Sequence, residues 1–128
     1  SSFSVEKISD PKEMQQAIAS MELEPEQQLV LENSVKNGDI NMAWIQAWDN
    51  YAEDGDVLKF ESQNYKITTT LMNKPVVFAL PLAPGMNYVK VTGIHDGGGG
   101  ITASVMTSSG ATSVPVIDEG MSYTLPIN

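Results

Sequence analysis

The densest group of reactive side chains is a run of carboxylates between residues 49 and 61, made up of Asp49, Glu53, Asp54, Asp56 and Glu61. Oxygen ligands at this density are the type that calcium prefers in proteins. The run matches an EF-hand loop only in part, because Ala52 occupies a ligand position and the residues after Asp56 favour a strand over a helix. The sequence predicts a calcium site formed by Asp54, Asp56 and Glu61. The alternative is a helix end followed by an acidic turn.

Groups that could do catalysis are scarce in this chain. It contains no cysteine, and His95 is its only histidine, which excludes a thiolate nucleophile and a zinc site built from several imidazoles or thiolates. His95 is followed by Asp96, two members of a serine triad, but no Gly-x-Ser-x-Gly motif accompanies them. We expect no catalytic residues, and a hydrolase centred on His95 is the one enzymatic hypothesis that is left.

Four consecutive glycines follow this pair: Gly97, Gly98, Gly99 and Gly100. A phosphate-binding glycine loop needs a helix after it, whereas the residues from 101 to 105 alternate as in a strand. Glycine permits unusual backbone angles and the close approach of another backbone. We expect either a flexible hairpin tip or a loop that, with His95 and Asp96, contacts a ligand or partner.

The two tryptophans form a second candidate for recognition. Trp44 and Trp48 recur with Ile40 and Tyr51 about every four residues, which predicts one face of a third helix between Asp39 and Gly55. Such a face either packs the helix onto a sheet or offers an aromatic platform to a sugar ring or a partner protein.

The charge of the chain limits its partners. The net charge is −9 and the seven basic residues are all lysines, so nucleic acid and anionic lipid would be repelled and bidentate arginine recognition of phosphate is excluded. Residues 1–61 hold 13 acids and 4 lysines, whereas residues 62–128 hold 3 of each. This acidic part either keeps the protein soluble or steers a cationic partner towards it.

Helix signals come first in the chain. Asp10-Pro11 supplies a cap and a first-turn proline, and the apolar residues from Met14 to Met21 form one stripe. Pro25 starts a second helix that Gly38 ends. Beyond Asp56 the spacing of apolar residues changes to two, in runs separated by turns rich in glycine and proline, which is typical of short antiparallel strands.

The segment Leu82-Ala83-Pro84-Gly85-Met86-Asn87-Tyr88 resembles the loop of fibronectin type III domains that leads into a tyrosine corner. In that family the tyrosine hydroxyl bonds back to nearby backbone, so the resemblance implies this role for Tyr88 and supports a β-sandwich. Lys90 and Thr92 depart from the family pattern, in which both positions are apolar.

We therefore expect an α+β fold, with two to three short N-terminal helices packed on a C-terminal antiparallel β-sandwich of about six to seven strands. Residues 1–128 would form a single domain, with a helical acidic subregion at 1–55 and an antiparallel β subregion at 56–128. No apolar run is long enough to span a bilayer, so we expect a soluble protein, either cytoplasmic or secreted with its signal peptide removed.

Two classes of function follow from this inventory. The first is a non-catalytic structural or protein-interaction module, which binds a protein partner or self-associates, with no obligatory cofactor. The alternative is a module that binds a small molecule or carbohydrate, with calcium as an aid.

Overall fold

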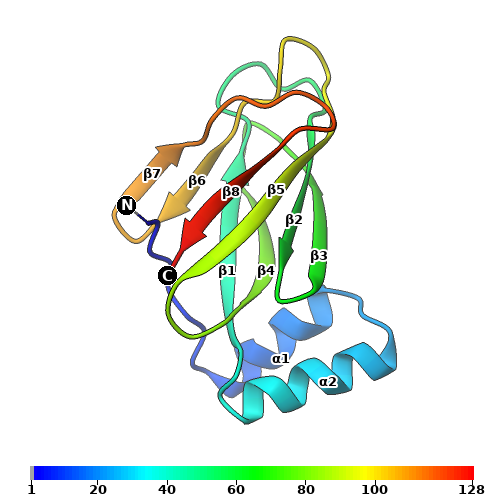
Figure 1. Ribbon diagram of the computed structural model, residues 1–128, viewed down its shortest axis with the longest axis vertical. Coiled ribbons are helices and arrows are strands. Elements are labelled where there is room, and N and C mark those ends of the chain that lie inside the picture. The colour runs from blue at the N-terminus through cyan, green and yellow to red at the C-terminus, as the bar shows by residue number, and fades with distance from the viewer. Residues whose placement is uncertain (1) are drawn as a thin grey trace.

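The computed structural model of the protein describes residues 2–128 and shows two helices and two antiparallel four-stranded sheets, which pack face to face (Figure 1). One sheet has the strand order β4-β1-β6-β7 and the other the order β3-β2-β5-β8. The elements are α1 (Pro11–Ser20), α2 (Pro25–Lys36), β1 (Asn41–Trp48), β2 (Val57–Ser62), β3 (Tyr65–Thr70), β4 (Val76–Leu82), β5 (Asn87–His95), β6 (Ser104–Thr107), β7 (Gly110–Ser113) and β8 (Ser122–Ile127).

The two predicted N-terminal helices are confirmed. Asp10 caps α1 by accepting a hydrogen bond from the backbone N–H of Glu13 at 2.9 Å, and proline occupies the first turn of both helices. Ala17 and Ile18 of α1 and Leu31 of α2 are buried. The helices lie at one end of the sandwich, beside the hairpin turn between β2 and β3 (Figure 1).

The predicted third helix is wrong, because this segment forms β1. A spacing of four fits one face of a strand as well as one face of a helix, since side chains on a strand repeat every two residues. Ala43, Ile45 and Ala47 face the interior between the sheets, while Trp44 and Trp48 lie on the opposite face and are half-buried. Tyr51 lies beyond the strand and is exposed.

The α+β arrangement of helices on a sandwich is confirmed, but its details differ from the prediction. The described residues contain two helices and eight strands, because β1 replaces a helix and adds a strand, while the strand expected over 101–105 lies at β6 and leaves Ile101 in an isolated bridge with Ile117. The helical part therefore ends at Lys36, and the β part begins at Asn41 rather than at residue 56. No helix in residues 2–128 has the length and apolar character needed to cross a membrane.

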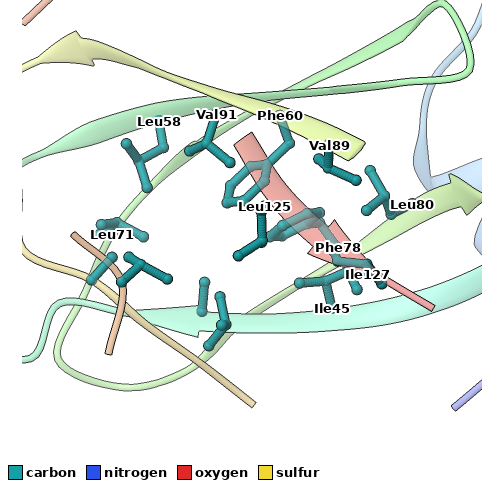
Figure 2. Close-up of a cluster of buried hydrophobic side chains, with 14 of the residues drawn as sticks. Ile45, Leu58, Phe60, Leu71, Phe78, Leu80, Val89, Val91, Leu125 and Ile127 are labelled. Atoms are coloured by element: carbon teal, nitrogen blue, oxygen red, sulfur yellow. The ribbon is translucent and has the colours of Figure 1, made fainter. Parts of the chain in front are cut away.

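The main core lies between the two sheets (Figure 2). Phe60 of β2 and Phe78 of β4 meet there with ring centroids 4.7 Å apart. A second cluster joins the helices to the outer face of β1 and β4 and includes Ile18, Leu31, Met42 and Ala79. Both faces of this sheet are thus covered at the helical end, which explains the nearly continuous apolar sequence of β1.

The first residues of the chain close one side of the sandwich. Phe3 pairs in parallel with Ile127 of β8, and the backbone N–H of Phe3 donates to the carbonyl of Pro126 at 2.8 Å. Further along, Lys7 pairs antiparallel with Ala43 of β1. Residues 3–7 therefore run from β8, an edge strand of one sheet, to β1 of the other sheet.

The tyrosine corner implied for Tyr88 is absent. Tyr88 is 72 % exposed, and its hydroxyl makes no hydrogen bond to the residues that the structure describes. The inward positions of β5 are instead Val89 and Val91, which places Tyr88 and Lys90 on the outer face. Lys90 and Thr92 depart from the family pattern because their positions in β5 alternate with the inward-facing valines, whereas in the family the same positions are apolar.

Candidate cation site

Four loops meet at the end of the sandwich opposite the helices (Figure 1). They comprise residues 49–56, 71–75, 96–103 and 114–121, and we call this end of the molecule the loop end. The acidic run and the four glycines, which are separated by about forty residues of sequence, both belong to it. The antiparallel order of the strands therefore brings two of the sequence candidates together.

Three aspartates converge at the loop end. Asp49 follows β1 directly, whereas Asp54 and Asp56 precede β2, so one loop supplies all three. One carboxylate oxygen from each lies within 4.8 Å of the other two. Calcium binds oxygen at about 2.4 Å, so two of its ligands can be at most about 4.8 Å apart, and these three oxygens fit around one such ion.

Each carboxylate of this aspartate cluster (Asp49, Asp54 and Asp56) has a buried oxygen that lacks a partner, although Asp54 as a whole is half-buried. Asp49 is 2 % exposed and Asp56 is fully buried. Asp49 Oδ2, Asp54 Oδ1 and Asp56 Oδ2 are inaccessible to solvent and accept no hydrogen bond from residues 2–128. No lysine of the described chain lies within ion-pair distance of them. Because an unpaired buried charge is costly, this arrangement calls for a cation or a proton.

The remaining carboxylate oxygens hold the cluster in place. Asp49 Oδ1 accepts hydrogen bonds from the backbone N–H of Tyr51 at 3.0 Å and from the hydroxyl of Thr102 at 2.9 Å. Asp56 Oδ1 accepts one from the backbone N–H of Gly97 at 2.8 Å. The two most buried aspartates therefore each use one oxygen to anchor a loop, and each leaves the other oxygen free.

Asp56 shows the electrostatic consequence of this crowding. Burial raises the pKa of its carboxyl to about 6, and the nearby carboxyls of Asp54 and Asp49 add to the rise. The hydrogen bond from Gly97 acts in the opposite direction, because it favours the charged form. Burial and mutual repulsion therefore both oppose ionisation of this carboxyl, and a bound cation would relieve both.

The glycine loop packs directly on the acidic loop. A Cβ atom at Gly97 would lie 1.8 Å from the carbonyl oxygen of Asp54, so only glycine fits at this position. The tip is held by Asp96, whose carboxylate accepts hydrogen bonds from the backbone N–H groups of Gly98 and Gly100. Gly97 is thus required by packing against another loop of the same chain, and contact of the four glycines with a ligand or partner stays a prediction.

Asn73 links a third loop to the cluster. Its side-chain amide donates to the carbonyls of Asp49 and Tyr51 at 3.0 and 2.8 Å, and its backbone N–H donates to Glu53 Oε1 at 2.7 Å. The backbone N–H of Asp49 in turn donates to the carbonyl of Met72 at 2.7 Å. The aspartate cluster therefore lies where three of the four loops are joined.

The other predicted ligand, Glu61, lies elsewhere. It is on the outer face of β2, where its carboxylate is 3.2 Å from the ammonium of Lys59, and this pairing lowers the pKa of Glu61. The structure therefore brings Asp54 and Asp56 together with Asp49. Asp49 belonged to the acidic run, but its position beside the other two becomes evident only once residues 41–48 form a strand.

The remaining candidates do not join the cluster. His95 ends β5 and is exposed, with Nδ1 3.7 Å from Glu119 Oε1, and within residues 2–128 it makes no hydrogen bond to a serine. Trp48 pairs with Ser104 of β6. Trp44 lies at the helical end, where its Nε1–H donates to Glu13 Oε1 at 2.9 Å, so it ties β1 to α1.

Comparisons with known proteins yield no relative: no protein-family model matches the chain, and neither a curated protein nor a solved structure does. The site must therefore be interpreted from its own geometry.

Proposed function

We propose that this protein is a non-catalytic β-sandwich module whose loop end is stabilised by a bound calcium ion and takes part in protein contacts. The observation that carries the proposal is the aspartate cluster: one carboxylate oxygen from each residue lies within 4.8 Å of the other two, and each residue has a buried oxygen without a hydrogen-bond partner in the described chain. Calcium accepts six to eight oxygen ligands in irregular geometry, and backbone carbonyls and water would complete its shell.

Calcium is preferred over magnesium on two grounds. Magnesium keeps several of its own waters and is usually bound by one or two carboxylates, whereas here three carboxylates converge and each has a buried oxygen without a partner. The burial of these oxygens also favours a structural role for the ion over a catalytic one, since a catalytic metal needs an open position for water or substrate.

The cation would act on the surface through the loops that it joins. Tyr51 is 80 % exposed and Met72 is 47 % exposed, and Asn73 connects the backbone of both loops to the cluster. Large side chains on rigid loops are effective anchors for protein partners. Ordering these loops by calcium would therefore lower the entropic cost of binding a partner.

The experiment is a calcium titration of chelator-treated protein, followed by thermal unfolding and by calorimetry. We expect calcium to raise the melting temperature of the parent protein, and Asp49→Asn and Asp56→Asn to abolish the increase. Asp118→Asn, an exposed aspartate in another loop of the same end, is the matched control and should retain it. Glu61→Gln should also retain it, because Glu61 lies outside the cluster.

Two results would count against the proposal. A parent protein whose melting temperature is the same in millimolar calcium and in chelator would exclude the site. Equal responses of Asp56→Asn and Asp118→Asn would show that calcium acts on general surface charge. If calcium does stabilise the parent protein, light scattering in calcium and in chelator separates self-association from a monomer that binds another protein.

A further inference from the structure

We infer that the outer face of the β3-β2-β5-β8 sheet binds a short acidic saccharide, at a site that is distinct from the aspartate cluster and independent of calcium. The site is the lysine face, which we define by Lys59, Lys66 and Lys90 and by the hollow beside them. The inference does not rest on the proposed function, and its test is made without calcium.

The register of the strands gathers three of the seven lysines around one carboxylate. Glu61 of β2 pairs with Lys66 of β3 on one side and with Lys90 of β5 on the other. Lys59 lies two residues away on the same strand and forms an ion pair with Glu61 at 3.2 Å. All three lysines act on Glu61, since each of them lowers its pKa. The face therefore carries a local excess of two positive charges in a protein whose net charge is −9.

A hollow of about 330 Å³ adjoins the lysine face, a volume within the range of small-molecule sites. Its lining includes Lys66, Glu61, Tyr88, Gln63 and Asn64, whereas Lys59 and Lys90 lie on the neighbouring strands outside the hollow. Gln63 and Asn64 form the tight turn between β2 and β3, where both have positive φ, at 53° and 67°. The amide of Asn64 makes no hydrogen bond to residues 2–128 and is free to bind a ligand.

The chemistry of these groups selects the ligand. Tyr88 is 72 % exposed and offers a ring face for stacking, the amides offer donors and acceptors for hydroxyl groups, and the lysines offer charge to a carboxylate or sulfate. The neighbouring positions of the face are hydroxyls, among them Thr68 beside Lys59 and Thr124 beside Lys90. An aromatic ring, amides, hydroxyls and ammonium groups on one surface match a sugar that carries an acidic group.

The charge of the rest of the molecule limits the length of this ligand. Away from the lysine face the protein is more negative than its net charge of −9, so a long polyanion would be repelled wherever it extends past the lysines. A ligand of two or three sugar units can stay within the positive region. The absence of arginine argues against phosphate, for which a bidentate guanidinium is the preferred partner.

The experiment is an NMR titration in chelator with trigalacturonate, compared with its fully methyl-esterified, uncharged form and with triglutamate. We expect saturable millimolar binding of trigalacturonate, with shifts confined to residues 59–68 and 88–92, and weaker binding of the other two. Lys66→Gln and Lys90→Gln should each weaken binding up to about fivefold, and higher salt should weaken it further. Lys74→Gln, in a loop at the opposite end, is the matched control.

The arms of the titration separate the outcomes. Absence of saturable binding would overturn the inference, and so would equal effects of Lys66→Gln and Lys74→Gln. Equal binding of triglutamate would show that the face attracts any small anion and has no site for a sugar. Tyr88→Ala should lose affinity while Tyr88→Phe retains it, since stacking needs the ring and not the hydroxyl. Because calcium is absent throughout, failure of this inference leaves the proposed function untouched.

Discussion

Replacing Asp56 by asparagine should change how the stability of the calcium-free protein depends on pH. The raised pKa of Asp56, about 6 instead of 3.8, means that its ionised form is less favourable in the folded than in the unfolded chain. This destabilisation is present above the folded pKa and disappears as pH falls towards the unfolded value. The calcium-free parent protein should therefore become more stable on mild acidification.

The size of the effect follows from the two pKa values. Full protonation in both states would recover about 3 kcal/mol, and about 1 kcal/mol of this is gained between pH 8 and pH 5, because at pH 5 the folded carboxyl is largely protonated while the unfolded one is still ionised. For a chain of this length that gain corresponds to an increase of about 4 °C in the melting temperature. Asp56→Asn should remove the gain, because asparagine keeps the acceptor for Gly97 and has no charge to titrate.

Calcium should compete with this proton. At a free calcium concentration of about 100 times its dissociation constant, the ion should add about 3 kcal/mol at pH 8 and about half as much at pH 5. The assay is urea or thermal unfolding followed by tryptophan fluorescence, at both pH values, in chelator and in calcium. Asp118→Asn controls for the general effect of removing a surface carboxylate. Parallel pH profiles for the parent and Asp56→Asn in chelator would refute the reasoning.

Three further substitutions test the contacts around the site and the core. Gly97→Ala would place a methyl group against the carbonyl of Asp54 and should cost about 1–3 kcal/mol in urea unfolding; an unchanged midpoint would contradict the close packing of the two loops. Thr102→Val removes the hydroxyl bond to Asp49 and should cost about 1 kcal/mol and weaken calcium binding in calorimetry, whereas Thr102→Ser should retain both. Phe60→Ala removes a fully buried ring from between the sheets and should cost about 3–5 kcal/mol, with a smaller loss for Phe60→Leu; a loss below 1 kcal/mol would place Phe60 outside the core.

The sequence predicted most clearly those elements that carry local signals. Asp10 and Pro11 mark the start of α1 because capping depends on neighbouring residues only, and the alternation from Tyr65 onwards marks β3 because its outer face is polar. β1 was missed because the helices cover its outer face near Met42, which removes the alternation that distinguishes a half-buried strand. Recognition of β1 would have required knowing which surface α1 covers, and this is a tertiary property.

The candidate site was predicted in part for a similar reason. The acidic run pointed to Asp54 and Asp56, since ligands close in sequence can share an ion. The EF-hand spacing predicts Glu61 as a ligand and not Asp49, because it assumes a continuous loop. In the protein, residue 57 begins a strand that carries Glu61 away, while the turn after Trp48 brings Asp49 back. The lysine face depended on cross-strand register, which the alternation of residues does not specify.

The pairing of Phe3 with Ile127 has a mechanical consequence. The two terminal segments run parallel and share backbone hydrogen bonds from Phe3 to Pro126 and from Asn128 to Phe3, at 2.8 and 2.9 Å. Tension applied through the two ends would therefore stretch these bonds side by side, in shear, and they would have to break together. When the protein is pulled by its two ends, the paired terminal segments would resist the force before either sheet begins to open.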